Sequence, residues 1–147
     1  MRFVAAVIIV LGALSGSAIA YAIEFRSVAD EITVLYDAPS VQSGKQLILT
    51  RGYPVEVIIA TDGWVRVRDE TGTFGWIESA RLDAKRTVMV SGAVAEAREA
   101  PDDSAAVVFR AEKGVFLEYL DVSGGWAKVR HRSGITAFIR LADLWGV

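Results

Sequence analysis

The sequence repeats itself at a fixed distance, and this repeat restricts the fold more than any other feature. Aligning the 147-residue chain with itself at an offset of 62 residues matches glycine, proline and tryptophan positions without an insertion. The main matches are Ala38-Pro39 with Ala100-Pro101, Gly52 with Gly114, Gly63-Trp64 with Gly125-Trp126, Val67-Arg68 with Val129-Arg130, Gly72 with Gly134, and Leu82 with Leu144. Such a fixed period is typical of a duplicated structural unit, so we predict two copies of one small fold.

Each unit has the residue pattern of short β-strands. In the first unit, the β-branched run Val55–Ile59 is followed by a turn and by Trp64–Arg68, which alternates with period two. The second unit repeats this hairpin with Gly114–Val122 and Trp126–Arg130. The residues that alternation directs toward the core are Val65, Val67, Ala127 and Val129. Each unit then closes with another turn and a short strand.

The fold class we predict is all-β, with two tandem small barrels after an N-terminal signal segment. A brief helical turn is expected at Glu78–Leu82 and at Arg140–Leu144, and no longer helix is expected beyond the leader. We expect the repeats to span residues 23–84 and 85–147. The connector Asp83–Thr87 is short, so the barrels are expected to pack side by side with a fixed relative orientation.

The first 22 residues have the order of a secretory signal peptide. A positive residue, Arg2, precedes the apolar run Phe3–Leu14 and the small residues Ser15–Ala20. An uncleaved membrane anchor is the alternative, because no charged residue occurs between Phe3 and Ile23 and about 20 apolar residues suffice to cross a bilayer. In both cases the rest of the chain is expected in the periplasm.

Composition argues against several classes of function. The chain has no cysteine and one histidine, which excludes a cysteine nucleophile and a typical zinc site. The net charge of −2 does not favour nucleic-acid binding. The paired carboxylates lie at predicted turns, where acidic residues are common. We therefore expect no enzymatic activity, no metal and no cofactor, and we interpret His131 as a solvated turn residue.

Several short motifs resemble those of a known family. The hairpin begins with Gly-Trp at Gly63 and Gly125, the closing strands are Gly75-Trp76-Ile77 and Ala137-Phe138-Ile139, and each unit opens with an Ala-Pro turn. Together they resemble bacterial SH3-like (SH3b) domains of exported envelope proteins, in particular the tandem proteins of proteobacteria. The resemblance implies SH3-like barrels and a binding function, with cell-wall peptidoglycan or its peptides as the partner.

The two units depart from the family pattern in different ways. The family turn begins with arginine, which the second unit keeps as Arg98, whereas the first has Tyr36. The second unit has Phe138 where the closing tryptophan is usual. If a ligand groove uses these positions, the two units should not bind identically.

The aromatic residues are the candidates for a ligand site, because aromatic faces supply large contact areas at low entropic cost. The candidate ligand-binding residues are Tyr36, Tyr53, Phe74, Trp76, Arg98 and Phe138. The residues that recur at the repeat offset, for which we favour a structural role, are Gly63, Trp64, Gly125 and Trp126. Two alternatives to peptidoglycan binding are open: an adaptor or inhibitor that docks on an envelope enzyme, and a structural domain without a small ligand.

Overall fold

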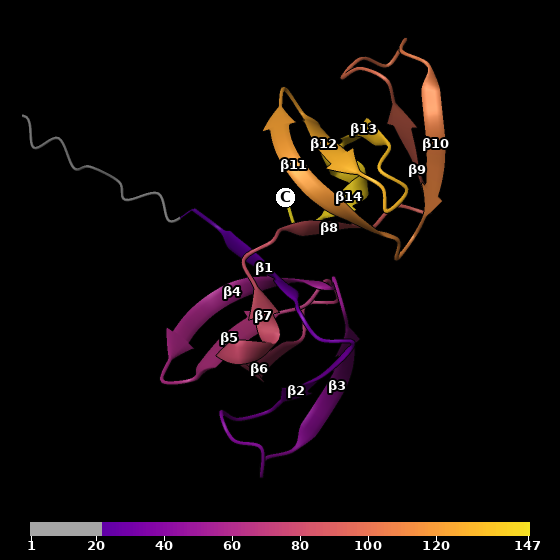
Figure 1. Ribbon diagram of the computed structural model, residues 1–147. Helices are drawn as coiled ribbons and strands as arrows, with labels where there is room; N and C mark the ends of the chain where they lie inside the picture. The colour runs from indigo at the N-terminus through magenta and orange to yellow at the C-terminus, as the bar shows by residue number, and fades with distance from the viewer. Residues whose placement is uncertain (1–21) are drawn as a thin grey trace, which may run out of the picture.

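The computed structural model describes residues 22–147 and is all-β (Figure 1). The predicted signal peptide lies outside these residues except for Ala22. Within the described range there is no α-helix, and no helix is long and apolar enough to cross a membrane.

The first seven strands form one antiparallel sheet, which we call repeat 1. Its elements are β1 (Glu24–Val28), β2 (Ile32–Tyr36), β3 (Lys45–Thr50), β4 (Pro54–Thr61), β5 (Trp64–Arg68), β6 (Phe74–Glu78), the 3₁₀ turn η1 (Ser79–Arg81) and β7 (Leu82–Asp83). The strand order across the sheet is β3-β2-β6-β5-β4-β1-β7.

The last seven strands form the second sheet, repeat 2. Its elements are β8 (Thr87–Val90), β9 (Val94–Arg98), β10 (Val107–Glu112), β11 (Phe116–Ser123), β12 (Trp126–Arg130), β13 (Thr136–Arg140), η2 (Leu141–Asp143) and β14 (Leu144–Trp145). Its strand order is β10-β9-β13-β12-β11-β8-β14. This is the order of repeat 1 with seven added to each strand number. The predicted all-β fold with two tandem copies is therefore confirmed, and η1 and η2 lie where brief helical turns were expected.

The central hairpin has the same register in both repeats. Thr61 faces Trp64 across the first turn, and Ser123 faces Trp126 across the second. Each turn needs a positive φ, which Gly63 supplies at 76° and which both Gly124 and Gly125 supply in repeat 2. A side chain at these glycines would strain the turn, because L-residues rarely adopt a positive φ.

Each barrel encloses its own apolar core. In repeat 1 the buried cluster is Val28, Leu35, Leu49, Val55, Val65, Val67 and Ile77. In repeat 2 it is Val88, Val90, Ala95, Ala97, Ala111, Leu117, Ala127, Val129, Ala137, Ile139 and Leu144. The four residues predicted to face the cores are all buried. With no disulfide available, burial of these side chains is the main source of stability.

The two cores use different residues at one contact between neighbouring strands. In repeat 1, a Cβ added at Gly75 would lie 2.4 Å from Cγ of Leu35. The equivalent residues of repeat 2 are Ala97 and Ala137, both buried. A large residue facing glycine in one copy is thus replaced by two small residues in the other.

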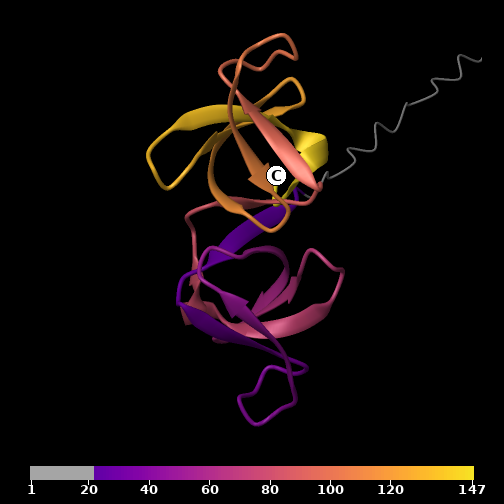
Figure 2. The same cartoon turned by 90° about the vertical axis from the view of Figure 1, so that its right-hand side faces the viewer.

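The two barrels are adjacent to each other, with β1 and β8 close to the junction (Figures 1 and 2). Aromatic side chains of the two barrels contact each other there. The rings of Phe25 and Trp145 meet edge to face at 5.3 Å, and those of Tyr53 and Phe116 at 5.7 Å. The guanidinium of Arg68 lies 5.5 Å from the Trp145 ring. These contacts join side chains of repeat 1 to side chains of repeat 2, as expected from the short connector.

Polar groups near the connector add to this junction. The Thr87 hydroxyl donates to the Gly52 carbonyl at 2.6 Å, and the Ser27 hydroxyl donates to the carbonyl of Lys85 at 2.6 Å. Arg86 donates to the carbonyl of Gly146 and lies against the Phe25 ring. The connector is therefore held at both ends, which fits a fixed orientation of the two barrels.

Candidate functional site

Outward-pointing side chains of β2, β3, β5 and β6 form one face of repeat 1. Along β5 and β6 these side chains alternate with fully buried ones, which directs Trp64 and Trp76 away from the core. The register places Tyr36 opposite Trp76, and Trp76 opposite Arg66. We call the following residues the repeat-1 face: Val34, Tyr36, Ile48, Trp64, Phe74 and Trp76.

Aromatic contacts order the centre of the repeat-1 face. The rings of Tyr36 and Trp64 meet edge to face at 5.6 Å, and both are partly exposed. Phe74 is 45% exposed, with the Arg66 guanidinium 5.2 Å from its ring. Because these rings are held by neighbouring side chains, a ligand would meet a preorganised aromatic surface.

The edge of the same face is aliphatic. Ile48 of β3 is directly opposite Val34 of β2, and Ile48 is 69% exposed. Ile32, on the same outer side of β2, is also exposed. The sheet order places β3 at the edge. Apolar side chains therefore continue from the aromatic centre of the face to an open strand edge.

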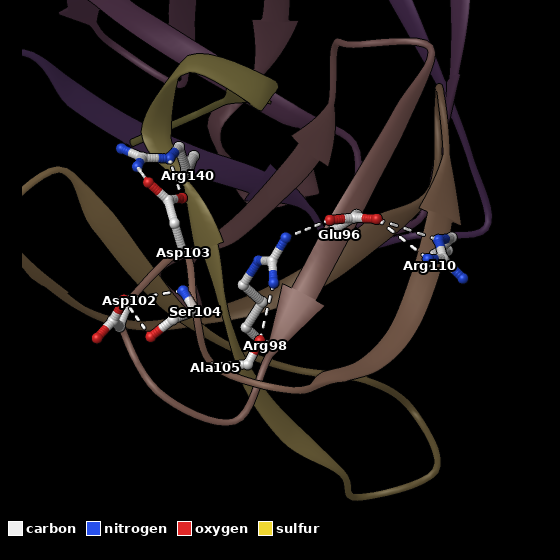
Figure 3. Close-up of polar contacts among 8 residues, drawn as sticks. All are labelled: Glu96, Arg98, Asp102, Asp103, Ser104, Ala105, Arg110 and Arg140. Carbon is white, nitrogen blue, oxygen red and sulfur yellow. Dashed lines mark hydrogen bonds and ion pairs between the residues drawn. The ribbon is translucent and has the colours of Figure 1, made fainter.

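The equivalent surface of repeat 2 carries charges instead. We call it the repeat-2 face, and it consists of Glu96, Arg98, Arg110, Trp126, Thr136 and Phe138. Glu96 and Arg110 replace Val34 and Ile48 at the same cross-strand position. Glu96 pairs with Arg110 and also with Arg98 (Figure 3). Here one carboxylate is shared by two guanidinium groups.

Arg98 is also held by the loop that follows β9. Its guanidinium donates to the carbonyl of Ala105 at 2.8 Å, and its side chain is only 19% exposed (Figure 3). Across the sheet, Arg98 is directly opposite Phe138. The positions that bring Tyr36 and Trp76 together in repeat 1 thus bring an arginine and a phenylalanine together in repeat 2.

The second tryptophan has a more enclosed environment than the first. Trp126 is 6% exposed, and the Arg140 guanidinium lies 4.6 Å from its ring. Arg140 also pairs with Asp103 of the loop after β9 (Figure 3). In repeat 1 the residue opposite Trp64 is Glu78. The same strand position therefore holds a partly exposed ring in one repeat and a covered ring in the other.

The structure separates the six predicted ligand-binding residues into three places. Tyr36, Phe74 and Trp76 lie together on the repeat-1 face. Arg98 and Phe138 lie together on the repeat-2 face. Tyr53 lies apart from both, at the junction with Phe116. No structural observation assigns a ligand to any of them.

Other residues of the two faces were not singled out from the sequence. Val34 and Ile48 extend the repeat-1 face, whereas Glu96, Arg110, Arg140 and Asp103 form the ion pairs of repeat 2. The repeat alignment could have found the contrast, because it pairs Val34 with Glu96 and Ile48 with Arg110. Within residues 22–147, no group of three acidic or histidine side chains has an arrangement that could hold a metal ion.

Comparison with known families gives two matches in one chain. Residues 29–84 and residues 91–146 each match the family described as bacterial SH3 domain. No curated protein matches the chain significantly.

Several solved structures are similar to the chain. A protein of the NlpC/P60 family from Bacillus cereus ATCC 10987 is 15% identical, over 83% of this chain and 56% of that one, with a TM-score of 0.39. NlpC1 from Trichomonas vaginalis is 19% identical, over 92% of this chain and 50% of that one, with a TM-score of 0.40. NlpC2 from the same organism is 17% identical, over 86% of this chain and 49% of that one, with a TM-score of 0.40. The chain spans about half the length of these three proteins.

Proposed function

Since the chain belongs to the bacterial SH3 domain family, we propose that it is an exported, non-catalytic binding module that recognises peptidoglycan or its peptides. The observation that carries this proposal is the repeat-1 face, where Tyr36, Trp64, Phe74 and Trp76 gather on the outer side of the sheet. Aromatic rings stack on sugar rings and on flat peptide groups, which are the two components of the cell wall.

Export to the periplasm is part of this proposal and depends on the leader. The charged start, apolar run and small residues of the first 22 positions would direct the chain through the membrane, with an uncleaved anchor as the alternative. Either outcome would place the barrels where the cell wall is accessible. The lack of cysteine and the single histidine support a role without catalysis.

Cosedimentation with purified sacculi tests the proposal. Wild-type protein should pellet with the sacculi at physiological salt, and Trp76→Ala should remain mostly in the supernatant. Loss of a central aromatic contact of about 2 kcal/mol corresponds to a roughly 30-fold weaker affinity. Phe138→Ala, at the equivalent position of repeat 2, is the matched control and should pellet like wild type. Wild-type protein that stays in the supernatant would reject wall binding.

A second candidate function, an adaptor that docks on another envelope protein, is favoured by the open edge of repeat 1. Strand β3 exposes Ile48 and Leu47 beside unpaired backbone groups, an arrangement that suits addition of an extended partner strand. If sacculi fail to retain the protein, a pull-down from envelope extracts with wild type and Ile48→Arg would test this alternative. The substitution introduces the residue that repeat 2 has at the equivalent position, and it should abolish capture of a partner protein.

A further inference from the structure

A hollow in repeat 2 lies apart from the aromatic surface of repeat 1. It has a volume of about 470 Å³ and opens between β10, the turn that joins β10 to β11, and the turn that joins β12 to β13. Its walls include the apolar Phe109, Val115 and Ile135 and the polar Arg110, Glu112 and His131. Phe109 and Val115 also pack against the core, so the floor of the hollow is apolar.

Repeat 1 has a larger side chain at a position equivalent to one wall of this hollow. Tyr53 is the residue equivalent to Val115, and it packs against the core of repeat 1. Burial raises the pKa of its hydroxyl, and the nearby charge of Asp69 raises it further. The phenol ring therefore reaches the turn after β5, whose counterpart in repeat 2 begins with His131 and borders the hollow.

The size of the equivalent side chains accounts for the empty space. Valine replaces tyrosine at 115, and Ala111 replaces Leu49, so two large side chains of repeat 1 are reduced in repeat 2. The backbone around them is conserved, because both repeats have the same strand order and the same turn hydrogen bonds at Asp69 and His131. Phe109, in place of Leu47, adds an aromatic wall to the space that results.

The turn beside the hollow also differs in charge and hydrogen bonding. His131 and Arg132 stand where repeat 1 has Asp69 and Glu70. The Ser133 backbone N–H donates to Nδ1 of His131 at 3.2 Å, which assigns the proton of the neutral ring to Nε2. The charged and polar groups that line the hollow are the Arg110 guanidinium, the Glu112 carboxylate and the His131 imidazole. The imidazole N–H and the guanidinium can donate to a ligand that carries an acceptor oxygen.

We propose that this hollow binds the tyrosine side chain of a partner polypeptide, with the ring against Phe109 and Val115 and the hydroxyl oxygen beside His131. The occupant is inferred from the molecule itself, because the protein places its own tyrosine in the equivalent space of repeat 1. The site is independent of the repeat-1 face, and it adds a second point of contact to the proposed binding module. Ile135, which is 47% exposed, forms the outer rim.

Titration with N-acetyl-tyrosinamide, followed by amide chemical shifts of the labelled protein, tests this site. We expect saturable shifts at Val115, His131 and Ile135 with a dissociation constant in the millimolar range, which is typical of one buried side chain. N-acetyl-phenylalaninamide should bind about fivefold more weakly because it lacks the hydroxyl oxygen. Absence of saturable shifts at these residues, or equal affinity for the two probes, would overturn the proposal.

A self-filling variant provides the sharpest control. Val115→Tyr should occupy the hollow with the residue that repeat 1 uses, and it should weaken binding of the probe at least tenfold. Val122→Tyr adds the same ring on the exposed end of β11 and should bind like wild type. If Val115→Tyr does not fold, His131→Ala removes the imidazole beside the proposed hydroxyl position and should weaken binding about fivefold. Wild-type affinity in either folded variant would contradict the assignment.

Discussion

The two barrels have the same strand order and nearly the same turns, but their outer faces differ. On repeat 1, the outer side of β2, β3, β5 and β6 carries aromatic and aliphatic side chains around Arg66, and Ile48 faces Val34. On repeat 2, Arg110 faces Glu96 at the same position and further ion pairs surround it. The comparison teaches that the shared core positions specify the barrel, whereas the outward positions are free to specialise.

The cores differ as well, but in a compensated way. Leu35 fills the space above Gly75 in repeat 1, and two alanines fill it in repeat 2. Neither repeat can exchange one member of the pair without creating a clash or a cavity. Divergence inside the barrel is therefore restricted to coordinated changes, in contrast to the independent changes of the outer face.

The largest expected effect comes from breaking this compensation. Gly75→Ala should destabilise the protein by about 3 kcal/mol, because the new Cβ overlaps the Leu35 side chain. Leu35→Ala alone should cost about 3 kcal/mol through the cavity it leaves. The double variant has the alanine pair of repeat 2. Its loss of unfolding free energy should be smaller by at least 1 kcal/mol than the sum of the two single losses. Urea denaturation in a double-mutant cycle measures this coupling, and strict additivity would contradict it.

The junction should decide whether the two unequal cores unfold together. Trp145→Ala removes the ring that contacts Phe25 and Arg68, with an expected loss of about 2 kcal/mol. Calorimetry should then show two transitions where wild type shows one, since repeats that no longer share an interface unfold independently. Val122→Ala, on the exposed end of β11, is the control and should leave one transition.

Much of the fold could be predicted from the repeat, but the contrast between the faces could not. The Gly-Trp hairpins and the inward valines followed from spacing and alternation. Strands β3 and β10 were missed, because neither Lys45–Thr50 nor Val107–Glu112 alternates clearly between apolar and polar residues. The closing role of β1 was also missed, since it pairs with β4 and β7 far along the chain.

The candidate site could be predicted only in part, for a physical reason. Tyr36 and Trp76 are separated by 40 positions in the sequence and become neighbours only through strand register. The sequence around Tyr53 is consistent with an exposed aromatic side chain. Its position at the junction is defined by the contact with Phe116 of the other repeat. Contacts between distant strands and between domains are not encoded in any local pattern.

A transplant of the charged pair should have a smaller effect on stability. Replacing Val34 and Ile48 of repeat 1 with the glutamate and arginine of repeat 2 should change the free energy of unfolding by no more than about 1 kcal/mol, because these positions are on the outer side of the sheet. Ile48→Arg alone should be less stable than the double variant by a few tenths of a kcal/mol. Chemical denaturation at low and high salt distinguishes the two, since only the pair should be weakened by salt.

The smallest effect concerns Tyr53, which has no tyrosine counterpart in repeat 2. Burial raises the pKa of Tyr53, and the Asp69 carboxylate raises it further. The resulting stabilisation is complete below the unfolded pKa of about 10 and is lost as pH rises through the higher folded pKa. Tyr53→Phe should therefore lose less stability than wild type as the pH rises above about 10. Melting temperatures over this range measure the difference, and parallel curves would contradict it.

The chain contains two copies of one barrel, and the proposed function assigns the binding face to repeat 1. Amide chemical shifts during titration with soluble peptidoglycan fragments test this assignment most directly. The account predicts that the shifts cluster at Tyr36, Phe74 and Trp76, while the equivalent Arg98, Thr136 and Phe138 remain unchanged. Shifts that are confined to repeat 2, or equal on both faces, would contradict it.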